Sequence, residues 1–332
     1  MTANSKIVLA SRPQGEAVAA NFRTVAETLR DPAEGEVLVR HNYLSLDPYM
    51  RGRMNDAKSY AACQQIDEVM VGGTVGEVLA SHNPRFKAGD HVVGMGGWQT
   101  HALSNGAGLQ KVDASKIPLQ AYLGPVGMPG VTAWYGINRI IKPKAGETIV
   151  VSAATGAVGT VVGQLAKLAG ARAVGIAGGA EKCAYAVSEL GFDACVDHRA
   201  SDFKKAFFAA TDKGVDGVFE NVGGLPLDLA MRKLNDFARI AVCGLVASGY
   251  DGTPSPLQNV AAMLSTRSLM QGFIVSDDMS VWPQALGELG AMVAGGKLKW
   301  RETVAQGLEA APEAFFGMLK GKNFGKQLVK LA

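Results

Sequence analysis

The sequence predicts an α/β fold made of a β-rich N-terminal domain and a doubly wound parallel sheet. Short apolar runs separated by turns fill residues 1–122, whereas apolar strands alternate with amphipathic helical segments over residues 123–295. A glycine-containing turn joins the first of these later strands to a helix. Residues 296–332 form a tail that ends in a strand-like segment, and we expect this tail to return to the first domain.

The β-rich domain is predicted from the spacing of its apolar runs. Three of them read EVLVRHNYLSL from Glu36, VGGTVGEVLA from Val71 and AGDHVVGM from Ala88. A turn from Pro84 to Asp90 precedes the strand of the third run. Short strands at such spacing, with no long helix between them, indicate a compact β-barrel-like domain.

The second domain is predicted from short apolar runs separated by helical segments. We expect strands at 148–152, 173–177, 194–197, 215–220, 237–243 and 269–275, and a helix at 280–295. The uncharged run from Thr148 to Ala166 approaches the length of a membrane span. Its β-branched start, its small and partly polar middle and the lysines that flank it favour a strand, a turn and a helix instead.

The composition is that of a globular protein. Of the 332 residues, 48% are hydrophobic and 19% are charged, and the 41 glycines show no collagen-like period. The net charge of +3 comes from charged residues spread along the chain, which argues against nucleic acid as a partner. Cys63, Cys183, Cys195 and Cys243 stand far apart, so we expect buried thiols rather than a disulfide framework. The N-terminus lacks the features of a secretory signal, so we expect a cytoplasmic protein.

The turn after the first parallel strand reads Ala154-Thr-Gly156-Ala-Val-Gly159, a variant of the dinucleotide-binding fingerprint with alanine in its first position. Gly156 would allow the backbone to approach a pyrophosphate, and Gly159 would allow the helix to pack against the strand. In the alternative interpretation, the glycines at this spacing only allow tight packing and bind no ligand. The surrounding strand, helix and strand favour a dinucleotide site.

The end of the next strand indicates which dinucleotide binds. Sites for NAD usually carry an acidic residue there, but this sequence has small residues, including Gly178, followed by Glu181 and Lys182. The lysine favours a 2′-phosphate and therefore NADPH. In the alternative interpretation, Glu181 binds the ribose and Lys182 is a solvated helix residue. His198 and Arg199, beyond the third strand, are either a second cationic contact or a surface pair.

No zinc site is expected. A zinc alcohol dehydrogenase needs a cysteine, a His-Glu pair and a further ligand at its active site, together with closely spaced structural cysteines. The histidines of the β-rich part, His41, His82, His91 and His101, show no short ligand spacing. A serine hydrolase is not indicated either, because Gly-x-Ser-x-Gly does not occur.

Six segments occur in an order that indicates a family. They read LDPYMR from Leu46, GMPGVTA from Gly127, AATGAVG from Ala153, ENVGG from Glu220, QGFIV from Gln271 and GKNFGK from Gly321. Together they resemble the zinc-independent medium-chain reductases of the leukotriene B4 dehydrogenase, or prostaglandin reductase, type, over nearly the whole chain. The stretch EKCAYAVSELGFDACVDHRASDF from Glu181 looks most similar to the bacterial NADPH-dependent curcumin reductases.

This resemblance implies a GroES-like catalytic domain, a Rossmann domain, NADPH as the cofactor and a homodimer. Its motifs place the cofactor-binding residues at Thr132, Gly156, Ala157, Val158, Gly159, Gly178, Lys182, His198, Asn221, Cys243, Tyr250, Phe273, Val275 and Asn323. Two departures from the family pattern stand out. His198 takes the place of a tyrosine found in many relatives, which makes the contact to the adenosine phosphate pH dependent. Gly249 and Asp251 vary the segment around Tyr250.

The resemblance also implies reduction of a carbon–carbon double bond that is conjugated to a ketone or an aldehyde. The substrate is then a small enone or alkenal. Tyr250 would donate a hydrogen bond to the developing enolate oxygen, and Tyr49 would orient the substrate carbonyl. The alternative role of both tyrosines is packing. Two other functions remain alternatives at this stage, a quinone reductase on the same scaffold and a non-catalytic NADPH-binding sensor.

Overall fold

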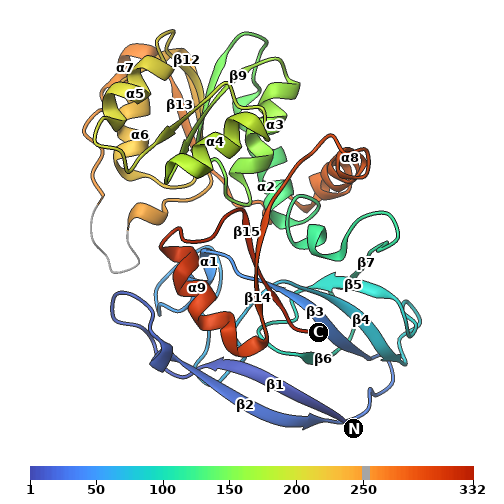
Figure 1. Cartoon of the computed structure of the whole chain (residues 1–332). Helices are drawn as coiled ribbons and strands as arrows, with labels where there is room; N and C mark the ends of the chain where they lie inside the picture. Colours follow the sequence, from blue (N-terminus) through green and yellow to red (C-terminus); the bar gives the residue numbers. More distant parts are fainter. Residues whose placement is uncertain (249–254) are drawn as a thin grey trace. The chain divides into compact units, whose positions relative to one another are not determined.

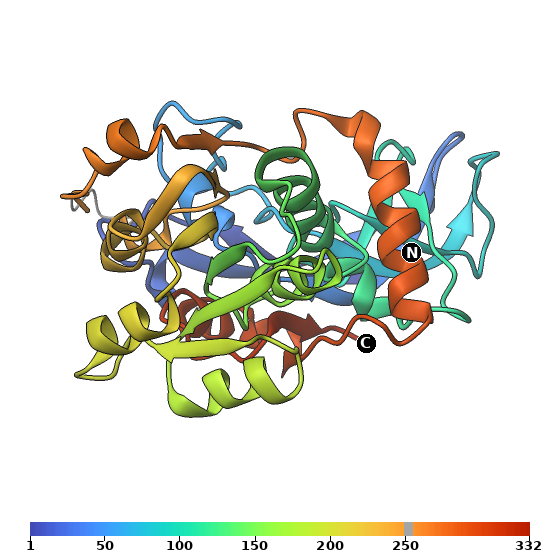
Figure 2. The same cartoon turned by 90° about the horizontal axis from the view of Figure 1, so that it is seen from above.

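The computed structural model describes residues 1–248 and 255–332, which divide into two compact units. The unit that we call the β-rich unit comprises Met1–Leu123, Glu302–Asn323 and Gln327–Ala332. The unit that we call the sheet unit comprises Gly124–Arg301 and Phe324–Lys326. Both termini lie in the β-rich unit (Figure 1, Figure 2). The domain boundaries that the sequence predicts, at residues 122/123 and 295/296, remain predictions.

Mostly antiparallel strands build the β-rich unit. Its strands are β1 (Thr2–Leu9), β2 (Phe22–Leu29), β3 (Val37–Ser45), β4 (Thr74–Ser81), β5 (His91–Gly94), β6 (His101–Ser104), β7 (Gln110–Lys111), β14 (Glu302–Gln306) and β15 (Lys326–Lys330). Its helical segments are η1 (Ala19–Asn21), α1 (Tyr49–Arg53), η2 (Leu119–Leu123), η6 (Leu308–Ala310) and α9 (Ala311–Leu319).

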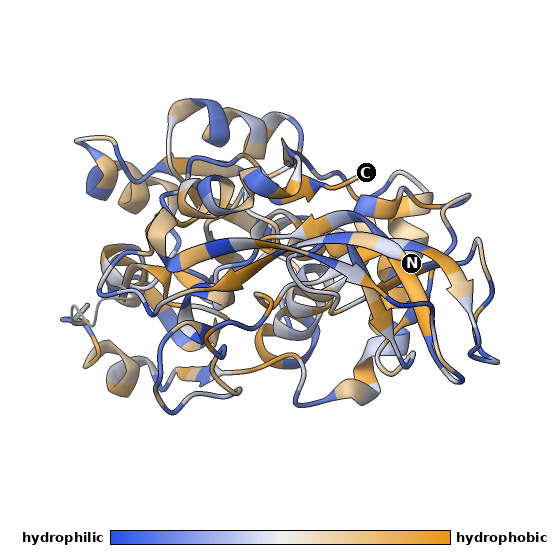
Figure 3. Ribbon diagram, turned by 90° about the horizontal axis from the view of Figure 1, so that it is seen from below, coloured by the Kyte–Doolittle hydropathy of each residue, from blue (hydrophilic) through white to orange (hydrophobic). Residues whose placement is uncertain are grey.

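The main sheet of this unit follows the order β14–β15–β3–β4–β5–β7, with β6 also paired to β3. Strand β15 is far from β3 in the sequence, yet the two pair antiparallel, with Leu328 opposite Ser45. Val37, Leu38 and Val39 are buried in succession along β3, because both faces of this central strand are covered. The hydropathy colours of Figure 3 show hydrophobic and hydrophilic residues along the strands of the molecule.

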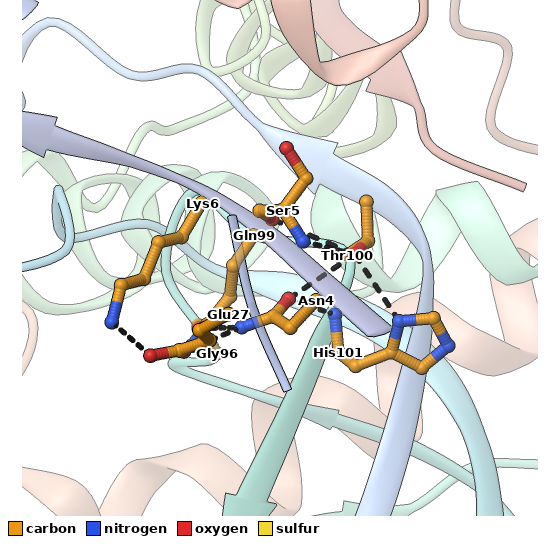
Figure 4. A network of polar contacts seen from close by, with 8 residues as sticks. All are labelled: Asn4, Ser5, Lys6, Glu27, Gly96, Gln99, Thr100 and His101. Atoms are coloured by element: carbon orange, nitrogen blue, oxygen red, sulfur yellow. Dashed lines mark hydrogen bonds and ion pairs between the residues drawn. The ribbon is translucent and has the colours of Figure 1, made fainter. Parts of the chain in front are cut away.

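A buried polar network joins β1 to the loop before β6 (Figure 4). The amide nitrogen of Asn4, a residue that is 2% exposed, donates to Glu27 at 3.0 Å and to Gln99 at 2.9 Å. Its carbonyl oxygen accepts from the Thr100 hydroxyl at 3.1 Å and from the His101 N–H at 2.9 Å. A buried amide is tolerated when its hydrogen bonds are made, so Asn4 fixes β1 to this loop.

The sheet unit alternates strands and helices. Its strands are β8 (Thr148–Ser152), β9 (Arg172–Ala177), β10 (Ala194–Asp197), β11 (Val215–Glu220), β12 (Leu234–Val242) and β13 (Leu269–Gly272). Its helical segments are α2 (Met128–Tyr135), η3 (Gly136–Ile141), α3 (Gly159–Leu168), α4 (Ala180–Ser188), α5 (Phe203–Ala210), α6 (Gly224–Met231), η4 (Val246–Ser248), α7 (Ala262–Thr266), η5 (Met279–Val281) and α8 (Trp282–Ala294).

Parallel pairing gives this sheet the order β10–β9–β8–β11–β12–β13 (Figure 1). The chain builds outward from β8 through β9 to β10, and then from β11 through β12 to β13. The direction of winding therefore reverses between β8 and β11. In open α/β sheets, ligands bind beside the carboxyl ends of the strands at such a switch point.

Alternate strand positions supply the core of the sheet unit. Val150, Val174, Val218 and Ile240 share one buried cluster with Phe207 of α5 and Leu227 of α6. Burial of each such side chain contributes about 1.5–3 kcal/mol before the loss of conformational entropy. Among the described residues, none of the helices has the length and apolarity that a membrane crossing requires.

The predicted α/β fold class is confirmed, and three elements differ most from the expected ones. The strand expected over 237–243 begins earlier, at Leu234, and ends at Val242. The strand expected over 269–275 ends at Gly272, because its neighbour β12 ends at Val242 and offers no further residues for pairing. The tail contains α9, which was not expected. Ala311 and Phe315, four residues apart, are buried on one face of that helix.

The expectation of separate buried thiols is wrong in part. Cys183 is buried, whereas Cys63, Cys195 and Cys243 are half-buried. The Sγ atom of Cys195 in β10 donates a hydrogen bond to Cys183 in α4 at 3.0 Å. Helix α4 packs against β10, the edge strand of the sheet, and this packing brings the two thiols together. No short sequence motif links them.

Candidate dinucleotide site

The glycine turn after β8 presents backbone N–H groups at the switch point. Gly156, Ala157 and Val158 are partly accessible. Gly156 forms a parallel β-bridge with Gly325, so part of the backbone of the turn is paired within the protein. A Cβ atom at Gly159 would lie 2.3 Å from the Ala153 carbonyl oxygen, so glycine is needed for α3 to pack on the turn. Accessible N–H groups at the start of a helix fit a pyrophosphate.

Cationic side chains gather where β9 and β10 end. A Cβ atom at Gly178 would lie 2.9 Å from His198 Nε2 and 3.0 Å from Arg199 Nε, so glycine leaves room for both side chains. Asp197 accepts a hydrogen bond from the N–H group of Arg199 at 2.9 Å, which fixes the start of this loop. Lys182 lies close enough to the pair to interact with both electrostatically. We call Lys182, His198 and Arg199 the cation cluster.

Charge and burial act together in the cation cluster. Burial, and then the charge of Arg199, lower the pKa of Lys182. Burial, and then Arg199, lower the pKa of His198 as well, although Asp197 opposes this shift. Lys182 and Arg199 are neighbouring cations that gain stability when a dianion binds beside them, and His198 can donate a hydrogen bond, so the cluster fits a 2′-phosphate. Glu181, the alternative ribose ligand, is 81% exposed and lies 3.9 Å from Arg301.

A buried carboxylate organises the carboxyl ends of β8 and β11. Ser152 Oγ donates to Glu220 Oε1 at 2.6 Å, and the same oxygen accepts from the N–H group of Gly223 at 2.8 Å. Asn221, a predicted cofactor residue, donates through its N–H to Ser152 Oγ and through Nδ2 to the Ser152 carbonyl, both at 2.8 Å. These bonds fix Asn221 beside the glycine turn.

Cys243 and Thr132 have defined positions in the sheet unit. The Cys243 N–H donates to the Glu220 carbonyl at 2.9 Å, which places this residue beside Asn221 at the end of β12. Burial, and then Glu220, raise the pKa of the Cys243 thiol to about 12, so the thiol is neutral. The Thr132 hydroxyl donates to the Met128 carbonyl within α2 at 2.8 Å.

Phe273 and Val275 follow β13. The Phe273 ring stacks on Tyr135 with the ring centres 5.3 Å apart and meets Phe219 edge-on at 6.1 Å. The Val275 carbonyl accepts a hydrogen bond from the Trp282 indole at 3.0 Å. Phe273 is therefore held by aromatic packing, and Val275 by the start of α8.

The other predicted site residues fall outside the sheet unit or outside the described residues. Asn323 belongs to the β-rich unit, and so does Tyr49, the first residue of α1. Burial, and then Asp47, raise the pKa of the Tyr49 phenol, so its hydroxyl stays protonated and can donate a hydrogen bond. Tyr250, the predicted enolate donor, lies outside the residues that the structure describes.

A pocket of about 370 Å³ opens in the β-rich unit. Its lining includes Arg53, Gln64, Glu68, Met95 and Gln99. Gln64 belongs to the segment that connects α1 to β4. The pocket combines amide and charged groups with methionine, which suits a ligand that has both polar and apolar parts.

Sequence reasoning missed the residues that support the predicted contacts. Ser152 and Glu220 hold Asn221, Phe324 lies beside Lys182, and Arg301 packs on Phe324. Glu220 and Phe324 both occur inside quoted motifs, ENVGG and GKNFGK, so the signal was present. Within the described residues, no three His, Cys, Asp or Glu side chains group together to hold a metal ion.

Family models match both parts of the chain. Residues 5–112 match the N-terminal domain of oxidoreductase, and residues 157–291 match the zinc-binding dehydrogenase model. The second match covers α3 and β9 to β13, and it includes the cation cluster, Glu220 and Asn221.

Three comparisons extend over nearly the whole chain. NADPH-dependent curcumin reductase of Escherichia coli (strain K12) is 48% identical and aligns with 99% of this chain and 97% of its own length. The 2-alkenal reductase (NADP(+)-dependent) of Nicotiana tabacum is 38% identical over 94% of this chain and 92% of its own. The crystal structure of CurA in complex with NADPH from Vibrio vulnificus is 47% identical, with a TM-score of 0.94 over 99% of each chain. The chain therefore belongs to the medium-chain dehydrogenases/reductases, in the group of prostaglandin and curcumin reductases that its six ordered motifs predicted.

Proposed function

We propose that this protein is an enzyme that uses NADPH to reduce the carbon–carbon double bond of α,β-unsaturated ketones and aldehydes. One observation carries the proposal: a glycine turn lies at the switch point between β8 and β11, and a cation cluster lies at the ends of β9 and β10, in a chain that is 48% identical to a curcumin reductase. The name of the tobacco relative, a 2-alkenal reductase, supports the substrate class.

Residues of the sheet unit would hold the cofactor. The N–H groups of Ala157 and Val158 bind the pyrophosphate, and Lys182 and His198 bind the 2′-phosphate. Asn221 contacts the ribose next to the nicotinamide. Further contacts come from Thr132, Gly178, Cys243, Phe273, Val275 and Asn323. Bound NADPH supplies the hydride that reaches the β-carbon of the substrate.

Tyrosine hydroxyls complete the chemistry in this proposal. Tyr250 donates a hydrogen bond to the oxygen that becomes enolate-like, and Tyr49 orients the substrate carbonyl. The raised pKa of Tyr49 keeps its hydroxyl a donor. A positioned donor of this kind stabilises the transition state by roughly 3 kcal/mol.

The test is anaerobic oxidation of NADPH, with NADH in parallel, in the presence of an alkenal, an alkenone, a curcuminoid or a quinone. The proposal expects NADPH-dependent gain of two hydrogens across the alkene, with the carbonyl intact, detected by mass. Turnover of the quinone alone would make the protein a quinone reductase. Tight NADPH binding without consumption of any acceptor would favour a sensor.

We also propose a homodimer. Strand β13 lies at the edge of the parallel sheet, and Leu264 and Leu269 near this edge are exposed. An exposed apolar edge strand offers unpaired backbone groups to a second copy. Light scattering measures the molar mass in solution, and a monomeric mass at micromolar concentration would contradict the proposal.

We place the enzyme in the cytoplasm. Four free thiols, including the neighbours Cys183 and Cys195, suit a reducing compartment. Cell fractionation with a tagged chain tests this placement, and recovery in a membrane or secreted fraction would refute it.

A further inference from the structure

Side chains from separate segments of the sheet unit meet beside the cation cluster. The Arg301 guanidinium lies 3.9 Å from the centre of the Phe324 ring. The Tyr185 ring meets Phe324 edge-on, with the ring centres 5.0 Å apart. The Lys182 ammonium lies 5.9 Å from the centre of the same ring. Lys182 and Tyr185 are one turn apart on α4, so Phe324 packs on the helix face that they share.

The backbone around Phe324 is fixed on two sides. Gly325 has a φ of 76°, and a Cβ atom there would lie 1.8 Å from the Arg301 carbonyl oxygen. The same oxygen accepts a hydrogen bond from the Lys326 N–H at 2.9 Å. Gly325 also forms a parallel β-bridge with Gly156 in the glycine turn. The Phe324 ring is therefore held between the turn and residue 301.

A fixed Phe324 ring restricts the conformations of the Lys182 side chain. The lysine side chain has four rotatable bonds and loses conformational entropy when its ammonium is held at an anion. Contact with a fixed aromatic ring removes part of that freedom before the anion arrives. The ion pair of Arg301 with the exposed Glu181, at 3.9 Å, is weak. The guanidinium also lies over the Phe324 ring at the same separation, 3.9 Å, and this contact does not depend on an exposed carboxylate.

We propose that Phe324, held in place by Arg301 and Tyr185, is a positioning residue that fixes the Lys182 ammonium for the 2′-phosphate of the cofactor. The proposal rests on the NADPH-dependent function proposed above and adds the residues that set the preference for NADPH over NADH. Phe324 acts through Lys182, so its loss weakens binding of the 2′-phosphate and leaves the rest of the adenosine contacts intact.

The test compares 2′,5′-ADP with 5′-AMP, which differ in the 2′-phosphate alone, by calorimetry on the full-length protein. We expect Phe324→Leu and Arg301→Leu each to weaken 2′,5′-ADP roughly tenfold. The affinity for 5′-AMP should stay within roughly twofold of the original value. Phe324→Tyr keeps the ring and should retain the original ratio of the two affinities.

Arg267 provides a matched control. Its guanidinium lies 4.8 Å from the Phe237 ring. Its side chain is 51% exposed, compared with 48% for Arg301. Arg267→Leu removes an equivalent arginine–phenylalanine contact from the same unit and should change neither affinity. In a Lys182→Ala background, Phe324→Leu should have no further effect on the ratio, because the group that it positions is gone.

Two results would overturn the proposal. Equal weakening of both nucleotides would show a general structural loss, and an unchanged ratio would show that Phe324 does not act on Lys182. If the unmodified protein itself fails to prefer 2′,5′-ADP, the NADPH-dependent function fails as well. If it shows that preference and the Phe324 variant keeps it, the positioning role of Phe324 alone is refuted.

Discussion

Ser152 and Glu220 share a hydrogen bond of 2.6 Å that joins the buried carboxyl ends of β8 and β11. The Ser152 hydroxyl donates to Glu220 and also accepts from the Asn221 N–H at 2.8 Å. The Ser152 side chain, which makes both hydrogen bonds, is buried away from solvent. Burial raises the pKa of the Glu220 carboxyl group, and the hydrogen bond from Ser152 opposes that shift. The bond therefore stabilises the ionised form of Glu220.

Ser152→Ala should therefore destabilise the fold. The variant leaves Glu220 short of one donor and the Asn221 N–H without its acceptor, which costs about 1–3 kcal/mol. Urea unfolding measures the loss. Ser188→Ala, at an exposed position in α4, is the control and should stay within about 0.5 kcal/mol of the original stability. Equal stability of the two variants would mean that the hydroxyl of Ser152 contributes nothing.

Two glycines inside helices of the sheet unit should respond in opposite ways to alanine. A Cβ atom at Gly163 in α3 would lie 1.9 Å from Phe192 Cζ, so Gly163→Ala should cost about 1–3 kcal/mol. At Gly287 in α8, no described atom lies within 4 Å of the new Cβ, so Gly287→Ala should stabilise by about 0.5–1 kcal/mol. Thermal unfolding of both variants measures the two changes in stability. A Gly163→Ala protein as stable as the original would contradict the close packing.

His41 should make the protein sensitive to acid. Burial lowers the pKa of His41 to about 4, and its Nδ1–H donates to the Gln99 carbonyl at 2.8 Å. The unfolded chain binds a proton on this ring at about pH 6.5. The free energy of unfolding should then fall as the pH decreases from about 6.5 to about 4, by at most about 3 kcal/mol.

His41→Asn, which keeps a donor near the Nδ1 position, should flatten this dependence in urea unfolding at about pH 7.5 and about pH 5. Part of the slope should remain, because burial also lowers the pKa of His101. A variant with the original slope would exclude His41 as a source of the acid sensitivity.

Tyr49 should not ionise in the working range of the enzyme. Burial and Asp47 raise the pKa of its phenol, so turnover at saturating NADPH should show no loss from Tyr49 ionisation up to about pH 10. Tyr49→Phe should lower turnover roughly tenfold or more, through loss of substrate orientation. Tyr122→Phe, which removes a hydroxyl bonded to the Asp113 carbonyl at 3.1 Å, is the control and should keep full turnover. A rate profile that falls with the ionisation of Tyr49 would contradict the assignment.

Tyr250→Phe should lower turnover roughly a hundredfold, because the variant lacks the donor proposed for the enolate oxygen. The affinity for 2′,5′-ADP should remain near its original value, since that ligand has no nicotinamide half. Stopped-flow measurement of NADPH oxidation with an alkenone gives the rate. Unchanged turnover would remove Tyr250 from the mechanism.

Local chemistry made much of the candidate site predictable. The glycine turn and Lys182 each lie within a short segment, where spacing alone indicates a phosphate contact. The structure places the glycine turn at the switch point between β8 and β11 and Lys182 at the start of α4, after β9, in the sheet that the alternation of strands and helices predicted.

The supporting residues were not predictable in the same way, because they depend on contacts between distant segments. Ser152 and Glu220 meet across neighbouring strands, and Phe324 reaches Arg301 and Lys182 from the tail. No periodicity in the sequence encodes such pairs. The early end of β13 has a similar origin, since the length of a strand depends on its neighbour.

The pairing of β15 with β3 has a consequence for biosynthesis. On a ribosome, β3 emerges early, but its partner β15 emerges after every strand of the sheet unit. The first half of β3 pairs early with β6, but Tyr43, Leu44 and Ser45 must wait unpaired on one side while β8 to β13 are translated and begin to fold. This side of β3 is the part of the growing polypeptide where a chaperone would have most to protect.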